Sequence, residues 1–121
     1  MNPRIMARAH GWFNLLSGVW PLVSMSSFEA VLGPKVDRWL VRTVAGLLVV
    51  NGVVQITARP SDDGLRQAAG LGLGTALTLG TIDAVYAGRG RISKVYLVDA
   101  VFEAAWVAGW LSARARISSE R

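Results

Sequence analysis

Cysteine is absent from this 121-residue sequence, and histidine occurs once, as His10. The absence of cysteine excludes disulfide bonds, thiolate metal sites and cysteine nucleophiles. A single histidine excludes a multi-histidine metal site within one chain. The sequence also lacks a phosphate-binding loop, an HExxH metal motif and a nucleophile elbow. We therefore expect no metal and no cofactor.

Charged residues are scarce as well, at 17% of the chain, against about 25% in a typical soluble domain. Hydrophobic residues make up 52%, and glycine is abundant with 13 residues. Transmembrane helices tolerate glycine better than soluble helices do. The net charge of +5 comes from arginines and lysines that lie mostly between apolar stretches, as they do at the ends of membrane helices. We expect the chain's partner to be the lipid bilayer and not a nucleic acid.

Four apolar stretches, separated by short polar turns, cover residues 11–32, 36–57, 65–87 and 94–112. Each is close to the ~20 residues that a helix needs to cross a bilayer. The turns contain the glycines, prolines and capping residues that end one helix and begin the next. Because the turns are short, consecutive helices must be antiparallel neighbours. The sequence predicts an all-α fold, an antiparallel up-down bundle of four transmembrane helices that forms a single integral membrane domain over residues 1–121.

Aromatic and basic residues indicate where these helices would meet the membrane surfaces. An aromatic belt is expected at Trp12 and Trp110 on one surface, and at Trp39, Tyr86 and Tyr96 on the other. Seven basic residues share the side of the termini, namely Arg4, Arg8, Arg59, Arg66, Arg114, Arg116 and Arg121. Six lie on the opposite side, namely Lys35, Arg38, Arg42, Arg89, Arg91 and Lys94. The positive-inside rule then favours cytoplasmic termini, by a narrow margin, in a cell inner membrane.

Small residues at four-residue spacing form two stripes on the third stretch, and such stripes let helix backbones approach closely in lipid. The first stripe is Gly72, Ala76 and Gly80, and the second is Gly70, Gly74 and Thr78. Asp83 continues the first stripe, so we expect it to face another helix.

The fourth stretch carries a stripe of acids and aromatic residues on one helical face: Tyr96, Asp99, Glu103, Trp106 and Trp110, spaced 3, 4, 3 and 4 residues apart. Asp83 and Asp99 each lie about five residues from a predicted helix end at the 88–93 turn. At 1.5 Å rise per residue, both are expected ~7–8 Å below the same membrane surface, with Glu103 ~6 Å deeper.

Arg42 is expected ~9 Å below that surface on the second helix, and Glu29 lies near the end of the first. Arg42 is therefore predicted to be the cation that approaches the acids. A charge at the bilayer centre costs about 2.5–3.5 kcal/mol, so an ionisable residue inside the membrane is a functional candidate. We predict proton-exchanging or ligand-binding roles for Glu103, Asp99 and Asp83, and ligand contacts for Arg42, Tyr86, Tyr96, Trp106, Trp110 and Glu29.

Two other interactions are predicted from the polar residues. An ion pair between Arg42 and Asp83 that only fixes the register of two helices is the alternative to a functional site. In the other half of the bundle, Asn14 and Asn51 lie at similar depths and are expected to form a hydrogen bond between helices.

Three functions fit this pattern. In the first, the chain binds or transports a hydrophobic or cationic small molecule with proton coupling, which implies a homo-oligomer because four short helices rarely enclose a pathway alone. In the second, it is a cofactor-free membrane enzyme in which an acid acts on a lipid or an isoprenoid. In the third, it is a non-catalytic membrane subunit whose small-residue stripes dock another protein.

Overall fold

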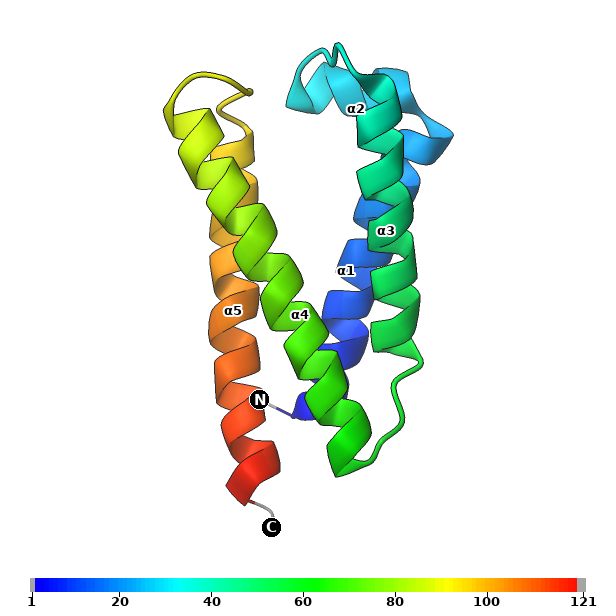
Figure 1. The fold of residues 1–121 in the computed structure, drawn as a ribbon, viewed down its shortest axis with the longest axis vertical. Coiled ribbons are helices and arrows are strands. Elements are labelled where there is room, and N and C mark those ends of the chain that lie inside the picture. Colours follow the sequence, from blue (N-terminus) through cyan, green and yellow to red (C-terminus); the bar gives the residue numbers. More distant parts are fainter. Residues whose placement is uncertain (1, 120–121) are drawn as a thin grey trace.

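The computed structural model of the protein describes residues 2–119, and within them the fold is entirely helical. The helices are α1 (Pro3–Val23), α2 (Met25–Leu32), α3 (Arg38–Ile56), α4 (Asp62–Ile82) and α5 (Tyr96–Ser119), and a π-helical segment, η1 (Asp83–Ala87), continues α4. Figure 1 shows α1, α3, α4 and α5 extended along a common direction, with α2 across one end. The predicted all-α class is confirmed.

The four long helices form two pairs, α1 with α3 and α4 with α5. Glycines make the first pair close. A side chain at Gly11 would meet the backbone oxygen of Gly52 at 2.8 Å, and one at Gly18 would collide with the backbone oxygen of Ala45. Small residues at the contact of two helices let their backbones approach in this way.

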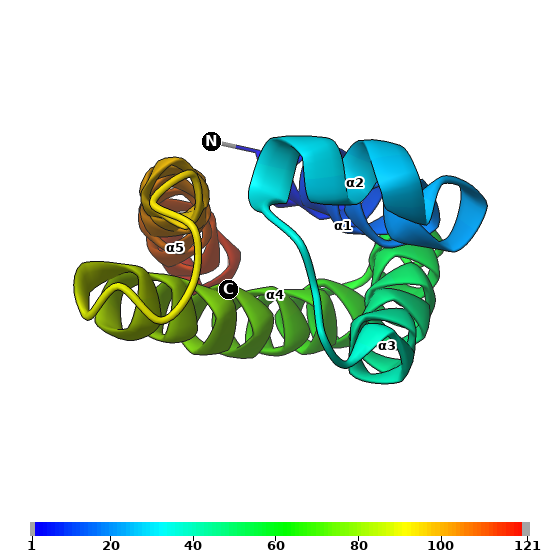
Figure 2. The same ribbon diagram turned by 90° about the horizontal axis from the view of Figure 1, so that it is seen from above.

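The two pairs meet near the end that holds both termini and diverge toward the other end (Figure 1). At the meeting point Met6 and Ala7 of α1 pack with α4 and α5, in a buried cluster completed by Ala68, Ala69, Trp110 and Ala113. Seen from above, α2 lies over α1, and the loop that follows it crosses to α3 (Figure 2). The core of the molecule is thus at its lower end.

The predicted first helix, residues 11–32, is wrong in two respects. α1 begins at Pro3, where the Asn2 side chain caps it by accepting a hydrogen bond from Arg4 N at 2.8 Å. It ends at Val23, and α2 turns away from it by 112°. A proline in the last turn, Pro21, weakens the helix there because its ring removes a donor and crowds the preceding turn.

Polar side chains hold the corner between α1 and α2. Ser24 caps α2 by accepting a hydrogen bond from Ser27 N at 3.4 Å. The Trp20 indole donates to Ser27 Oγ at 2.9 Å, which links the end of α1 to the start of α2. Glu29 consequently lies on α2, across the end of the molecule, and not at the end of a continuous first span.

Two helical segments, α3 and the continuous stretch Asp62–Ala87 formed by α4 and η1, are long and apolar enough to cross a membrane. The bent pair α1–α2 becomes a third if it counts as one span. By this measure α5 is not among them, since it carries Asp99, Glu103, Arg114 and Arg116. In residues 2–119, length and composition therefore support two to three spans.

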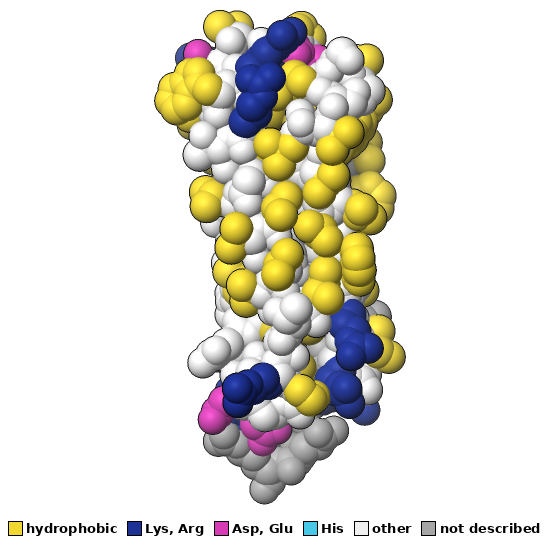
Figure 3. All heavy atoms as spheres, turned by 90° about the vertical axis from the view of Figure 1, so that its right-hand side faces the viewer, with side chains coloured by type: hydrophobic (Ala, Val, Ile, Leu, Met, Phe, Trp, Pro, Cys, Tyr) yellow, Lys and Arg dark blue, Asp and Glu magenta, His cyan; other side chains and the backbone are white. Residues whose placement is uncertain are grey.

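The surface agrees with a membrane environment. Figure 3 shows apolar side chains along the middle of one face, with basic and acidic side chains gathered toward the two ends. The apolar side chains that α3 exposes include Leu40, Val44, Leu47, Val50, Val53 and Val54. Soluble monomers rarely expose contiguous apolar patches larger than a few hundred Å². A band of this kind is typical of a surface that contacts lipid.

Candidate functional site

Three acids from neighbouring elements come together where η1 lies beside α5, and we call Asp83, Asp99 and Glu103 the acid cluster. Asp83 of η1 lies close enough to Asp99 and Glu103 of α5 for the three carboxyl groups to interact electrostatically. Asp83 is 4% exposed and Glu103 is 1% exposed.

Local sequence explains how α4 and α5 bring these acids together. Gly80 faces Glu103: a side chain at Gly80 would meet the Glu103 Cβ at 3.2 Å. Asp83 begins the π-helical turn η1, and such turns are rare and frequent at functional sites. The first small-residue stripe thus faces another helix, as the sequence predicts, and the structure identifies that helix as α5. In the second stripe, a side chain placed at Gly70 or Gly74 would have no neighbouring atom within 4 Å.

The second stripe lines an open groove instead. This groove, of about 430 Å³, runs between α3 and α4 and is bounded by Val44, Leu47, Leu48, Asn51, Gly70, Leu71, Gly74, Thr75, Thr78 and Leu79. It is separate from the acid cluster, since none of the three acids lines it.

The acid cluster lacks hydrogen-bond and ion-pair partners among the other described side chains. Both carboxyl oxygens of Glu103 and Oδ2 of Asp83 are buried without a hydrogen-bond partner among residues 2–119. Within the same residues, no arginine or lysine forms an ion pair with any of the three acids. Burying a charge without a partner is among the most expensive arrangements in a protein.

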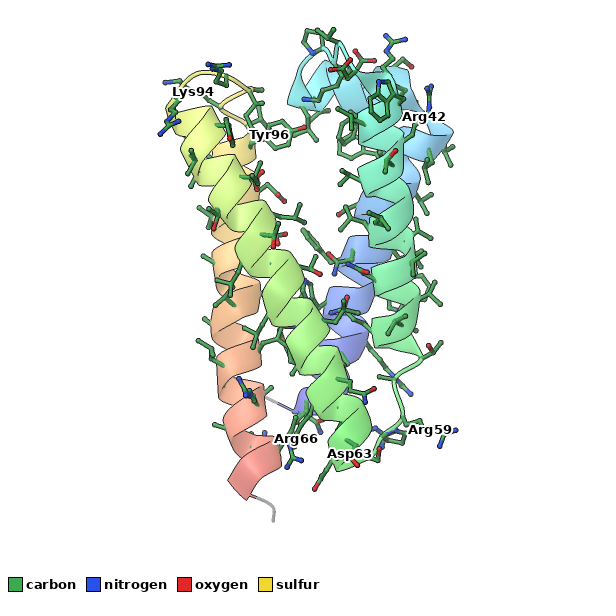
Figure 4. The ribbon with its side chains drawn as sticks, in the orientation of Figure 1. Arg42, Arg59, Asp63, Arg66, Lys94 and Tyr96 are labelled. Carbon is green, nitrogen blue, oxygen red and sulfur yellow. The ribbon has the colours of Figure 1, made fainter. Side chains whose placement is uncertain are left out.

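The predicted approach of Arg42 to the acids is wrong. Arg42 is exposed, and Figure 4 shows it on the outer side of α3, away from α4 and α5. The two helix pairs diverge at this level, so α3 is far from the acids. The Arg42 side chain therefore extends outward, which keeps its guanidinium group in a polar environment. The alternative ion pair between Arg42 and Asp83 is absent from the described part of the chain for the same reason.

Two further predicted ligand residues, Tyr86 and Glu29, are respectively exposed and paired with other residues. The Tyr86 side chain is 39% exposed. Glu29 is bound locally, since it accepts a hydrogen bond from Lys35 N at 2.9 Å and forms an ion pair with Arg38 at 2.8 Å. Glu29 thus secures the corner between α2 and α3.

Tyr96 connects the two helix pairs at their open end. The Lys35 ammonium lies 4.5 Å from the centre of the Tyr96 ring, and Figure 4 shows Tyr96 at the upper end of α5. A cation at this distance is attracted by the ring face. Partial burial lowers the pKa of Lys35, and the charge of Glu29 acts in the opposite direction. Sequence analysis missed Lys35, which lies in a turn and offers no periodic signal.

Closer to the core lies a second polar group, His10, Asn14, Gln55 and Trp110, which we call the histidine cluster. The Asn14 amide donates to Gln55 Oε1 at 2.7 Å, and Gln55 Nε2 lies 3.0 Å from His10 Nδ1. The Trp110 indole donates to the same His10 nitrogen at 2.8 Å. Because an indole N–H can only donate, Nδ1 is an acceptor and the ring proton is on Nε2. His10 is therefore a neutral imidazole that connects α1, α3 and α5.

The histidine cluster corrects two predictions. Trp110 is not a residue of the membrane surface but is fully buried. Asn14 bonds to Gln55, whereas Asn51 donates to Thr75 Oγ1 at 3.1 Å on α4. Asn51, one turn before Gln55 on α3, therefore bonds to α4, whereas Gln55 bonds to α1.

The acid-and-aromatic stripe of α5, which the sequence placed on one helical face, contributes residues to both clusters. Its members are half-buried or buried, while Leu97, Val98, Val101 and Phe102 on the other faces are exposed. Trp106, between the clusters, stacks on His10 with 4.6 Å between ring centres. Its buried indole nitrogen and His10 Nε2 both lack a partner in the described residues.

The described residues contain no group of three or more histidines, aspartates or glutamates arranged to hold a metal ion. No family model matches the chain, and neither a curated protein nor a solved structure is significantly similar to it. Its function must therefore be argued from the site.

Proposed function

We propose that the chain is an integral membrane protein of four transmembrane helices that binds a proton or a small cation at the acid cluster. Exchange of the bound proton for the cation at this cluster would couple proton movement to the transport of a small hydrophobic or cationic molecule. The observation that carries this proposal is Glu103, which is 1% exposed and has both carboxyl oxygens unpartnered. A carboxyl group in that position must hold a proton or attract a cation, because an isolated charge is too costly there.

The proposal that α5 also crosses the membrane is supported by the direction of its polar residues. α5 has 24 residues, which exceeds the ~20 needed for a span. Its two acids face inward, and Val98 and Val101 face outward. Charged residues within a span are expected on the bundle interior. Both termini would then lie on the same side of the membrane, which we propose is the cytoplasmic side of a cell inner membrane.

Assembly into a homo-oligomer is the second part of the proposal. The groove between α3 and α4 leaves Gly70 and Gly74 without neighbours, and small residues favour close helix contacts in lipid. We propose that a second copy of the chain packs against this face. If so, chemical crosslinking in lipid captures a dimer, and Gly74→Leu removes it while Gly88→Leu, also without neighbours, does not.

Proton binding can be measured directly by infrared difference spectroscopy on the protein in lipid nanodiscs, titrated from acidic to alkaline pH. We expect a carboxyl C=O band that disappears as the pH rises and that Glu103→Gln removes. Asp63→Asn serves as the matched control, because Asp63 is exposed at the other end of the molecule.

Transport is tested in proteoliposomes under an imposed pH gradient with an entrapped pH-sensitive dye. We expect addition of an aromatic cation to cause proton movement in the native protein and in Asp63→Asn, but not in Glu103→Gln or Asp83→Asn. Equal signals from all four proteins would rule out a role for the acid cluster.

A further inference from the structure

Ring contacts fix the level at which α1 faces α5. His10 stacks on Trp106, with ring centres 4.6 Å apart. One turn further along α1, Phe13 lies 5.4 Å from Trp106 and 6.1 Å from Phe102. The two helices run in opposite directions (Figure 1). Moving up α1 from His10 therefore corresponds to moving back along α5 from Trp106.

By this register, Asn14 of α1 and Glu103 of α5 lie at nearly the same level. Asn14 is four residues above His10, ~6 Å along the axis, and Glu103 is three residues above Trp106, ~4.5 Å. Both side chains are buried, at 0% and 1% exposed.

The unpartnered atoms at this level are acceptors. Asn14 Nδ2 is used in the bond to Gln55, so Asn14 presents its carbonyl oxygen, Oδ1, which is buried and has no partner in the described residues. The same is true of both oxygens of Glu103. The unpartnered donors nearby, His10 Nε2 and Trp106 Nε1, are neutral groups and cannot balance a carboxylate charge.

An ammonium group matches these acceptors better than other small cations. Its positive charge neutralises the carboxylate, and its several N–H bonds can be shared between a carboxylate and an amide oxygen. The aromatic rings of Phe13 and Trp106 border the same level and attract cations and apolar groups alike. A quaternary cation has the same charge but no N–H to donate.

We infer that an organic ammonium ion binds between Glu103 of α5 and Asn14 of α1, with N–H bonds to both side chains. The inference rests on the proposed function and narrows its ligand from any cation to one that carries N–H donors. The acceptor atoms are sealed from solvent, so α1 and α5 must separate at this level for the ligand to enter. The two pairs already diverge above it (Figure 1).

Two probes of similar size test the inference with the full chain in lipid nanodiscs. Benzylammonium carries N–H donors, and benzyltrimethylammonium does not. Isothermal titration calorimetry should show that benzylammonium binds at least about tenfold more tightly, the effect of one hydrogen bond to a charged group. Asn14→Leu should reduce this preference, because only the N–H bonds to Glu103 remain, and Asn51→Leu, in which a different asparagine of the interior is replaced, should retain it in full.

The comparison of probes on the native protein requires no variant, so it stands even if Asn14→Leu fails to fold. Equal affinity for the two probes, or no binding of benzylammonium, would overturn the inference. So would a folded Asn14→Leu protein, judged by circular dichroism, that keeps the native preference. The infrared titration of Glu103 separates the two proposals: if its band is present while the probes bind equally, proton binding stands and only the ammonium site fails.

Discussion

The histidine cluster and the acid cluster lie on the same face of α5 but differ in how their polar atoms are satisfied. In the histidine cluster, three hydrogen bonds link the side chains of His10, Asn14, Gln55 and Trp110, and His10 Nε2 and Asn14 Oδ1 are the buried atoms left without a partner in the described residues. In the acid cluster, the Glu103 oxygens have no partner in the described chain. A satisfied buried network rigidifies a core, whereas an unsatisfied one is costly and persists where function requires it. We therefore assign stability to the bonded atoms of the first cluster, and ligand binding to Glu103 of the second together with the unpartnered Asn14 Oδ1.

Removing Trp110 should have the largest effect, because it is the largest fully buried side chain and joins α5 to α1 and α4. Trp110→Ala is expected to lower the free energy of unfolding by about 3–5 kcal/mol, measured by titration with a denaturing detergent. Trp12→Ala, at a tryptophan 51% exposed, is the control and should change it little. Similar losses in both variants would contradict a core at the lower end.

Filling the contact between α4 and α5 should have the next largest effect. A side chain at Gly72 would collide with the Trp110 indole nitrogen, so Gly72→Leu is expected to destabilise the fold by about 1–3 kcal/mol. Gly46, on α3, has nothing within 4 Å, and Gly46→Leu should be tolerated. The same detergent titration compares them, and an equally stable Gly72→Leu protein would show that this stripe is not packed.

A substitution in each cluster separates their roles most directly. Gln55→Leu breaks the bonds to both His10 and Asn14 and should cost about 1 kcal/mol, without loss of proton movement in proteoliposomes. Glu103→Gln removes a buried acid without partners, so it should abolish proton movement without lowering stability. If only Glu103→Gln lost stability and only Gln55→Leu lost transport, the roles assigned to the two clusters would have to be reversed.

The arginines of α3 should give the smallest effects. Arg42→Gln is expected to change the unfolding free energy by less than about 0.5 kcal/mol and to leave proton movement intact, because Arg42 is exposed and distant from the acids. Arg38→Gln loses an ion pair with Glu29 and should cost up to about 1 kcal/mol. A transport defect in Arg42→Gln would restore it as a partner of the acids.

The sequence determined the features that depend on one helix at a time. Regular spacing placed the stripe of α5 on one face and Asp83 on the packed face of α4, because positions three and four residues apart share a helical surface. Composition and length indicated apolar helices with short polar turns, and they also predicted the all-α class. The break between α1 and α2 at Ser24 was harder to predict from the sequence, since Pro21 indicates a weak point in the helix but does not determine the angle between the two helices.

Only the tertiary structure decided which faces meet and how far apart they lie. Depth along a helix suggested that Arg42 would reach the acids, but α3 pairs with α1 and diverges from α5 at that level. Trp110 was expected at the membrane surface from its residue type and its place near a helix end. It is buried instead, because the antiparallel packing of α1 and α5 brings His10 against it. Depth is a property of a single helix, whereas contact depends on its rotation and its choice of neighbour, which packing of the whole chain sets.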